Sequence, residues 1–461
     1  MNKHSTVLRL LHESMDIFRN FGAASEIPGY ISAIFFYKYL CDDEKTLQAL
    51  GKTPRFLIPV GWSFDDLLWR RSTSEFSKIM TMAFSRVAEI NTETLEGVFE
   101  PFASVAYLTT IRAPRDWDKA VKDVFELISY LNLAEPELAI GESFIAWLEY
   151  NATNNKYFAP EFTPLEIDDL LVRLVQPQAR DEIYDPACGT GTTLVHAAKA
   201  ANNNVLIWGQ DINPYVCSIA KMNMILNGII GAKIFTENTL TDPRFLEGHI
   251  LRLFDVVLCD LPFGMSNWGS ERLTNDPRFF RGLPPRSHSE WAFITHIVES
   301  IKDNGRAAVV VPMGVLFRSG TEASIRKSLI DENLIDAVIQ LPSNLLLNTT
   351  VAISIIVIKK HRDHDDILFI DAGAYLRKNN STVKFPSFEI DHIVDAFHSR
   401  QDQPYVRRVS RDQLRDNSSL MASHYTSNSP QAPDIAQLEL RLASLTSELS
   451  EVRNRISRYF R

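Results

Sequence analysis

The sequence predicts an α/β protein with a mainly parallel sheet, a helical domain before it and a long helix after it. Short runs rich in Val and Ile alternate with longer helical patterns between about residues 180 and 360, as parallel strands joined by helical crossovers require. The first 150 residues lack this alternation and are mainly helical in pattern. Residues 434–461 repeat apolar side chains every three or four positions, which indicates a heptad helix.

The composition fits a globular chain of more than one domain. The 461 residues are 45% hydrophobic, and no apolar run approaches the ~18 residues of a membrane span. The four cysteines form no CxxC pair, so we expect neither a metal site nor disulfides, and a reducing, cytoplasmic location. The net charge of −9 argues against a long unaided DNA footprint. Any DNA contact is expected to be local or shared with a more basic partner.

Four segments are expected along the chain. Residues 1–150 form the helical domain, in which EIPGYISAIFFYKYLCDDE is apolar nearly all round and predicts a buried helix. Residues 151–376 hold the sheet. Residues 377–433 are a polar extension with one helical pattern, FEIDHIVDAFHSR, and residues 434–461 form the heptad helix.

The sheet is expected to contain a series of strands separated by helices. The strand patterns, in order, are EIYDP, VLIWGQD, FDVVLCD, RAAVVVP, LIDAVIQLP and VAISIIVIKK. Only a short polar segment separates the last two, which favours a hairpin and therefore an antiparallel last strand.

The heptad helix is the strongest sign of a protein partner. Asp434 is placed to cap its start. Its seam comprises Ile435, Leu438, Leu442, Leu445, Leu449, Val452, Ile456 and Tyr459. Such a seam packs on another helix, either in a partner or in this chain.

A glycine loop follows the first strand, in IYDPACGTGTTL. Gly189 and Gly191 allow the backbone to approach a ligand closely. The next strand ends at Asp211, where a carboxylate can accept from both hydroxyls of a ribose. Asp185, before the glycines, would repel a diphosphate and attract an amino group. We therefore favour an adenosyl ligand with an amino-acid tail over a dinucleotide, with a ligand-free tight turn as the alternative.

One strand later, FTENTLTD places Asn238 near the same strand ends. Its side-chain oxygen can accept from an adenine amino group. A turn-forming Asn is an equally good interpretation.

The stretch CDLPFGMSNWG combines a strand end with a carboxylate and an aromatic ring. The strand ends at Asp260, and Pro262 biases Leu261 to an extended conformation that fixes its carbonyl. Two acceptors beside the ring of Phe263 suit a planar amino group such as that of adenine. A strand end followed by a core Phe is the alternative.

With these motifs, the sequence resembles the amino-methyltransferases that act on DNA bases. It most resembles the modification (M) subunit of type I restriction-modification systems, over nearly the whole chain. The matching segments are DPACGTG, the acid-Leu-Pro-Phe motif, ASEIPGYISAIFFYKYLCDDE, NTETLEGVF, APEFTPLEIDDLL, GQDINPYVCSIAKMNMILNGI, SEWAFITHIVES, GRAAVVVPMGVLFRSGTEASIRKSLIDENLIDAVIQLPSNL and ILFIDAG. The resemblance implies a Rossmann-like S-adenosylmethionine-dependent methyltransferase that methylates adenine N6 in DNA after flipping the base out of the duplex.

The resemblance also assigns roles by position. The cofactor-binding residues it implies are Phe162, Thr163, Asp185, Ala187, Gly189 and Gly191 on the methionine side, Asp211 for the ribose and Asn238 for the adenine. The catalytic residues it implies are Asp260, Leu261, Pro262 and Phe263. The family motif usually has Pro where Leu261 stands, which keeps open a catalytically impaired scaffold. Methylation of RNA or of a protein glutamine is a further alternative.

A basic and aromatic stretch follows the catalytic motif and is expected to contact DNA. Its predicted DNA-binding residues are Trp268, Arg272, Arg278, Arg281 and Arg286. An ordinary long loop is the alternative. By resemblance, the expected partners are DNA, a specificity subunit, a second copy of the modification subunit and a restriction or translocase subunit, with no membrane.

Overall fold

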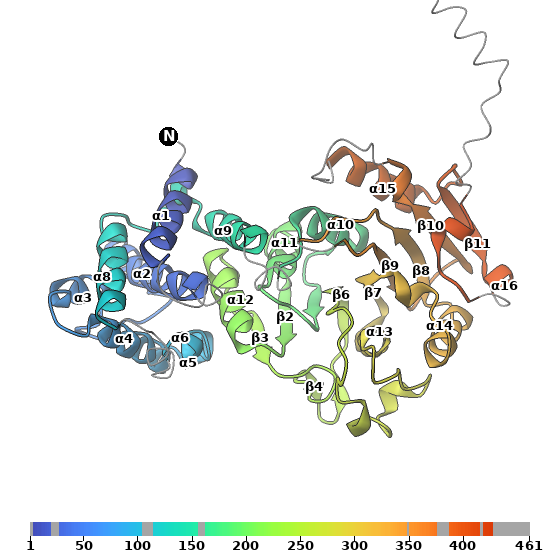
Figure 1. Cartoon of the computed structure of the whole chain (residues 1–461), viewed down its shortest axis with the longest axis horizontal. Coiled ribbons are helices and arrows are strands. Elements are labelled where there is room, and N and C mark those ends of the chain that lie inside the picture. Colours follow the sequence, from blue (N-terminus) through green and yellow to red (C-terminus); the bar gives the residue numbers. More distant parts are fainter. Residues whose placement is uncertain are drawn as a thin grey trace, which may run out of the picture.

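A nine-stranded sheet forms the centre of the larger, C-terminal part of the protein (Figure 1). The computed structural model describes residues 3–19, 27–103, 114–154, 162–347, 350–375, 387–414 and 418–426. The strands of the sheet are β1 (Glu182–Asp185), β2 (Leu206–Asp211), β3 (Lys233–Thr236), β6 (Phe254–Asp260), β7 (Ile301–Pro312), β8 (Ile335–Gln340), β9 (Ile353–Lys359), β10 (Asp366–Asp371) and β11 (Val406–Ser410). A separate ribbon pairs β4 (Leu246–Glu247) with β5 (Ile250–Leu251).

The strand order is β11-β10-β8-β9-β7-β6-β1-β2-β3. Strands β3, β2, β1, β6 and β7 pair in parallel, which confirms the predicted α/β class. The predicted hairpin is also present, because β9 is antiparallel to β8. Strand β9 lies between β7 and β8, however, and is not the last strand. Strand β10 adds in parallel to β8, and β11 closes the edge in antiparallel.

Strand β11 falls in the segment that the sequence analysis describes as a polar extension. Its buried side chains, Val406 and Val409, stand three positions apart and flank two exposed arginines. A strand with strict alternation would bury every second residue. This pattern therefore gives no period-two signal. The helix predicted in the same segment is confirmed as α15 (Ser387–Ser399).

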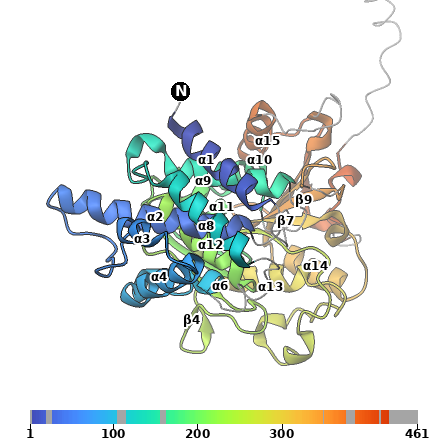
Figure 2. The ribbon, with the colours of Figure 1, turned by 60° about the vertical axis from the view of Figure 1, so that its left-hand side comes forward.

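The N-terminal part is a bundle of helices at one end of the molecule (Figure 1). Its helices are α1 (Lys3–Phe18), α2 (Ile27–Ala49), α3 (Phe64–Arg70), α4 (Phe76–Ile90), α5 (Thr92–Leu95), α6 (Glu100–Ala103), α8 (Pro114–Ile128) and α9 (Ile140–Asn154). Helix α2 is buried without a break from Ile27 to Asp43, as its continuous apolar sequence predicts. The bundle core continues into Ile219, Met222 and Ile225 of helix α12 (Pro214–Leu226), so the bundle is packed directly on the α/β part. Figure 2 turns this end of the molecule forward.

Helices cover both faces of the sheet. One face packs against α10 (Leu165–Val175), α11 (Thr192–Ala200), α12 and α15. The other packs against α13 (Glu290–Ser300) and α14 (Thr321–Asp331). Strand β6 shows the alternation: Val256 and Leu258 belong to the first core, whereas Val257 and Cys259 belong to the second. A strand with two buried faces explains why FDVVLC is apolar except at Asp255, which is partly exposed and pairs with Lys302.

The remaining expectations from the sequence concern the heptad helix, the segment boundaries, membrane spans, metal sites and the cysteines. The heptad helix of residues 434–461 lies outside the described residues, and the four segment boundaries stay predictions. Within the described ranges, no helix is both long and apolar enough to cross a membrane. The same part of the chain contains no group of three His, Cys, Asp or Glu side chains suited to a metal ion. All four cysteines are buried and unbridged.

Candidate active site

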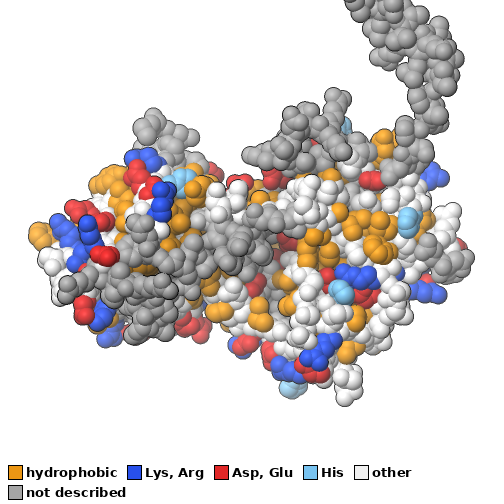
Figure 3. Space-filling view, in the orientation of Figure 1, with side chains coloured by type: hydrophobic (Ala, Val, Ile, Leu, Met, Phe, Trp, Pro, Cys, Tyr) orange, Lys and Arg blue, Asp and Glu red, His pale blue; other side chains and the backbone are white. Residues whose placement is uncertain are grey.

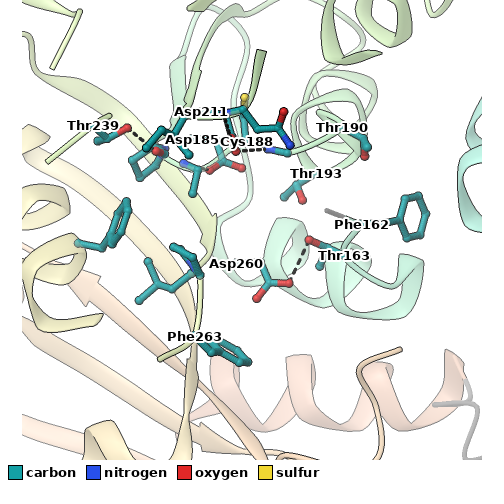
Figure 4. Close-up of a pocket in the computed structure, with 18 of the residues that line it drawn as sticks. Phe162, Thr163, Asp185, Cys188, Thr190, Thr193, Asp211, Thr239, Asp260 and Phe263 are labelled. Carbon is teal, nitrogen blue, oxygen red and sulfur yellow. Dashed lines mark hydrogen bonds between the residues drawn. The ribbon is translucent and has the colours of Figure 1, made fainter. Parts of the chain in front are cut away.

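Three acidic residues end three neighbouring strands at one side of the sheet. Asp185 ends β1, Asp211 ends β2 and Asp260 ends β6. Because β1 lies between β2 and β6, this is the point at which the strand order reverses, where ligands bind in open α/β sheets. A cavity of about 570 Å³ opens there and is lined by all three acids (Figure 4).

The cavity brings together eleven of the twelve residues predicted to bind cofactor or to act in catalysis. The predicted residues that line it are Phe162, Thr163, Asp185, Ala187, Gly189, Asp211, Asn238, Asp260, Leu261, Pro262 and Phe263. The exception is Gly191, which caps α11 with φ +74. A Cβ at Gly191 would lie 3.0 Å from the Met224 Cε and 3.2 Å from the Ala220 Cβ. This glycine is therefore required by the turn and by the close approach of α12.

The carboxylate of Asp211 is fixed by the backbone on both sides. Its Oδ2 accepts from the Gly189 N–H at 3.0 Å, and its Oδ1 accepts from the Asn213 N–H at 2.9 Å. Burial raises the pKa of Asp211, while these two backbone donors act in the opposite direction. Each oxygen keeps a further lone pair, so a rigidly held acceptor faces the cavity beside the glycine loop.

Asp185 lies deeper in the same cavity. Its Oδ1 accepts from the Ala187 N–H at 3.0 Å, and only 2% of the residue is exposed. Burial raises the pKa of Asp185 well above its usual value, and the nearby acidic groups of Asp211 and Asp260 act in the same direction. A cation bound in this cavity would lower that pKa and favour the ionised form.

Asn238 lines the cavity, but its side-chain oxygen is already used. The Oδ1 accepts from the Leu240 N–H at 2.9 Å and from the Thr241 N–H at 3.3 Å, which closes a local turn. This geometry matches the turn interpretation of FTENTLTD. The role of Asn238 toward adenine stays a prediction.

Asp260 is the catalytic candidate, and a threonine from another segment holds it. The Thr163 hydroxyl donates to the Asp260 Oδ2 at 3.1 Å, as the dashed line in Figure 4 shows. Burial raises the pKa of Asp260 to about 7, against the opposing effect of the Thr163 hydrogen bond. Thr163 is assigned to the cofactor by resemblance alone. Its observed contact links that segment to the end of β6.

The raised pKa of Asp260 predicts a pH-dependent reaction. A carboxyl with a pKa of about 7 is protonated below pH 7 and ionised above it. On acidification a charged acceptor for an amino group would become a neutral carboxyl, whose carbonyl oxygen accepts more weakly. We expect the single-turnover rate of methyl transfer to fall below pH 7 and to level off above about pH 8. The matched variant is Asp260→Asn, whose amide oxygen accepts at every pH. A wild-type profile as flat as that of Asp260→Asn would contradict the prediction.

Leu261, which stands where the family motif usually has Pro, is a core residue. It is only 3% exposed and belongs to the core beneath α13, and its N–H donates to the Val310 carbonyl at 3.4 Å. A proline here would lose that N–H. Phe263 is partly buried between the two cores of the sheet and borders the cavity (Figure 4).

The stretch predicted to bind DNA is partly an internal structural element. Trp268 is 2% exposed, and its Nε1–H donates to the Pro285 carbonyl. Arg278 is 7% exposed and donates to the Leu240 carbonyl at 2.6 Å and to Asp276 at 2.7 Å. These contacts engage both side chains inside the fold, and their DNA-binding role stays a prediction.

Arg281 is also committed to internal partners. It forms 2.6 Å ion pairs with Glu299 and Glu332, and only 6% of its side chain is exposed. Two of the predicted residues remain at the surface: Arg272, which pairs with Asp242, and Arg286, which donates to the Asn267 Oδ1. On the face shown in Figure 3, basic and acidic side chains are interspersed.

Several residues of the cavity wall have no signal in the sequence. The apolar ones are Met265, Phe293, Leu346, Leu347 and Val351. They come from three segments that are far apart in the chain. Each has the sequence context of an ordinary core or loop residue, and only the fold brings them to the same cavity.

The fold and the cavity define a methyltransferase of the α/β class, with an antiparallel strand inserted beside a parallel sheet and acids at the carboxyl ends of its central strands. A sequence model of the N-6 DNA methylase family matches residues 139–432, which is more than half of the chain, and the chain belongs to this family.

Known proteins agree with this assignment. The chain is 31% identical to the type I restriction enzyme MpnII methylase subunit of Mycoplasma pneumoniae, over 79% of this chain and 72% of that protein. It is 27% identical to the HindI methylase subunit of Haemophilus influenzae, over 63% of this chain and 68% of that protein. It spans 58% of the length of the MjaVII methylase subunit of Methanocaldococcus jannaschii, at 26% identity.

Among solved structures, the methyltransferase subunit of a type I restriction-modification system from Streptococcus thermophilus superposes with a TM-score of 0.81 at 25% identity. The match covers 92% of this chain and 99% of that one. These comparisons confirm the predicted family and the predicted class of enzyme, an adenine-specific DNA methyltransferase. They favour it over the RNA, protein-glutamine and scaffold alternatives.

Proposed function

We propose that this chain methylates adenine N6 in DNA with S-adenosylmethionine, as the modification subunit of a type I restriction-modification complex, and that the cavity at the ends of β1, β2 and β6 is its active site. The observation that carries the proposal is the meeting of Asp185, Asp211 and Asp260 in one cavity of about 570 Å³. This volume lies within the usual range of small-molecule sites.

The donors and acceptors of the cavity suit the two halves of S-adenosylmethionine. Asp211, held by the Gly189 and Asn213 N–H groups, is a rigid acceptor for a ribose diol. Asp185 is a buried acid with a raised pKa, which makes it a suitable partner for the ammonium group of the amino-acid tail. When bound, the sulfonium supplies the methyl group.

The remaining residues act on the target amine. Asp260 and the Leu261 carbonyl accept from its two N–H bonds and so hold its lone pair toward the methyl group. Phe263 stacks on the flipped base beside them. These residues lower the barrier mainly by positioning, and the carboxylate also stabilises the positive charge that develops on nitrogen.

The test compares cells with and without the gene. We expect N6-methyladenine at one defined DNA sequence only when the gene is present with its neighbouring partner genes. Calorimetry on the purified complex should show binding of S-adenosylmethionine. Binding of the cofactor without any methylated adenine would contradict DNA methylation, and an absence of both would refute the enzyme.

We further propose a specificity subunit, a second modification subunit and a restriction or translocase subunit as partners. The chain is acidic overall, so a base-reading partner would supply the sequence preference and part of the phosphate contacts. A solved structure described as showing complex assembly in a type I system superposes with a TM-score of 0.69 at 17% identity, which supports a shared fold.

The heptad segment gives this partner proposal its test. Deleting residues 434–461 is expected to abolish co-purification with the specificity subunit, because the deletion removes the apolar seam. The affinity for S-adenosylmethionine should stay within about twofold, because the deletion spares every cavity residue.

A matched control keeps the seam and changes its surroundings. Ser447, Glu451 and Asn454 occupy heptad positions away from the seam in the sequence. A chain in which all three are changed to alanine should still assemble with the specificity subunit. Normal assembly of the deleted chain would contradict the role of the heptad segment.

A further inference from the structure

A buried glutamate contacts the turn that carries the catalytic motif. Glu290 is the first residue of α13 and is 0% exposed. Its Oε1 accepts from the Gly264 N–H at 3.3 Å, and Gly264 directly follows Phe263. Glu290 does not line the cavity, so it reaches the site only through this backbone contact.

An arginine compensates the buried charge of Glu290. The Arg318 Nη2 donates to the Glu290 Oε1 at 3.2 Å, and its Nη1 donates to the Glu322 Oε1 at 3.0 Å. Arg326 in turn holds the Arg318 carbonyl at 3.1 Å. A buried carboxylate is costly unless it is paired, and Arg318 supplies that pairing to two acids at once.

The turn at Gly264 has a conformation that favours glycine. Gly264 has φ +62, and apart from its chain neighbours no heavy atom lies within 4 Å of the place where a Cβ would stand. Glycine has access to a wide range of backbone conformations. An acceptor aimed at its N–H therefore restricts the peptide unit between Phe263 and Gly264.

We propose that Glu290 is a positioning residue for the catalytic turn. Through the Gly264 N–H it fixes the peptide that carries the Phe263 ring, and Arg318 holds its carboxylate in place for this purpose. The proposal rests on the function proposed above for the cavity. A merely structural role, in which the acid only favours the start of α13, would affect stability but not the turn.

Glu322 provides a matched control. It is 2% exposed and pairs with the same arginine, but it has no contact with Gly264. The variants Glu290→Met and Glu322→Met each remove one of the two carboxylates and leave Arg318 with the other. Single-turnover methyl transfer, affinity for S-adenosylmethionine, thermal stability and hydrogen exchange of the peptide containing Gly264 are measured on the assembled complex.

We expect Glu290→Met to lower the transfer rate by about ten- to a hundredfold, with cofactor affinity nearly unchanged and faster exchange at Gly264. Glu322→Met should lose as much thermal stability as Glu290→Met. Its transfer rate and its exchange at Gly264 should stay at the wild-type values. If Glu290→Met does not fold, the pair Glu290→Gln and Glu322→Gln gives a smaller effect in the same direction, because a neutral acceptor bonds more weakly.

If Glu290→Met and Glu322→Met show the same rate of hydrogen exchange at Gly264, or lose the same fraction of the methyl-transfer rate, the positioning role of Glu290 is wrong. An inert wild-type complex would instead refute the function proposed for the cavity. In that case the exchange measurement still decides whether Glu290 holds the turn.

Discussion

Replacing Asp260 with alanine is expected to lower the rate of methyl transfer by about a hundred- to a thousandfold, because the target amine loses its side-chain acceptor. Affinity for S-adenosylmethionine should stay within about twofold, since the side-chain hydrogen bond of Asp260 is to Thr163 and not to the glycine loop. The measurement is single-turnover transfer to DNA by the assembled complex, beside calorimetry with the cofactor.

The melting temperature of Asp260→Ala distinguishes a loss of catalysis from misfolding. Burial raises the pKa of Asp260 to about 7, which means that its ionised form is disfavoured in the folded protein. Removing the group should therefore not lower the melting temperature. The control is Asp260→Asn, which keeps an acceptor oxygen and should retain most activity. Equal rates for wild type and Asp260→Ala would remove Asp260 from the mechanism.

The central strands and their acids could be predicted because the signals are local. A parallel strand buried on both faces is rich in apolar residues, and the acid that ends its pattern lies at the carboxyl edge of the sheet. This reasoning places Asp185, Asp211 and Asp260 together without any knowledge of the loops. The glycine loop is equally local, although the structure assigns Gly191 to helix packing.

The internal partners of Arg281 could not be predicted, because they are not local in the sequence. In the sequence, Arg281 stands among polar and aromatic residues and resembles a surface cation. Its partners, Glu299 and Glu332, are 18 and 51 positions away and belong to different elements. Only the packing of α13 and α14 turns this arginine inward.

Glu290 was missed because its context suggests a simpler role. An acid at the first position of a helix, directly after Ser289, is an ordinary helix-start signal. Its contact with Gly264 spans 26 positions and depends on how α13 packs beside the end of β6. The position of strand β9 between β7 and β8 is likewise set by long-range pairing, which the hairpin pattern alone does not specify.

Replacing Asp211 with alanine is expected to weaken binding of S-adenosylmethionine by about ten- to a hundredfold. This estimate corresponds to the loss of a hydrogen bond with a charged partner, worth about 1.5–3 kcal/mol. Two effects act together, because the ribose loses its acceptor and the Gly189 and Asn213 N–H groups lose the carboxylate that orders the loop.

Asp211→Ala and Asp260→Ala act as controls for each other, since each removes one partly exposed carboxylate from the same cavity. If the assignments are right, titration calorimetry shows weakened cofactor binding only for Asp211→Ala. At saturating cofactor, that variant should then recover much of the transfer rate, whereas Asp260→Ala should remain slow at any concentration. Unchanged cofactor affinity in Asp211→Ala would place the ribose elsewhere, and recovery of Asp260→Ala by added cofactor would show that the two acids share one role in binding.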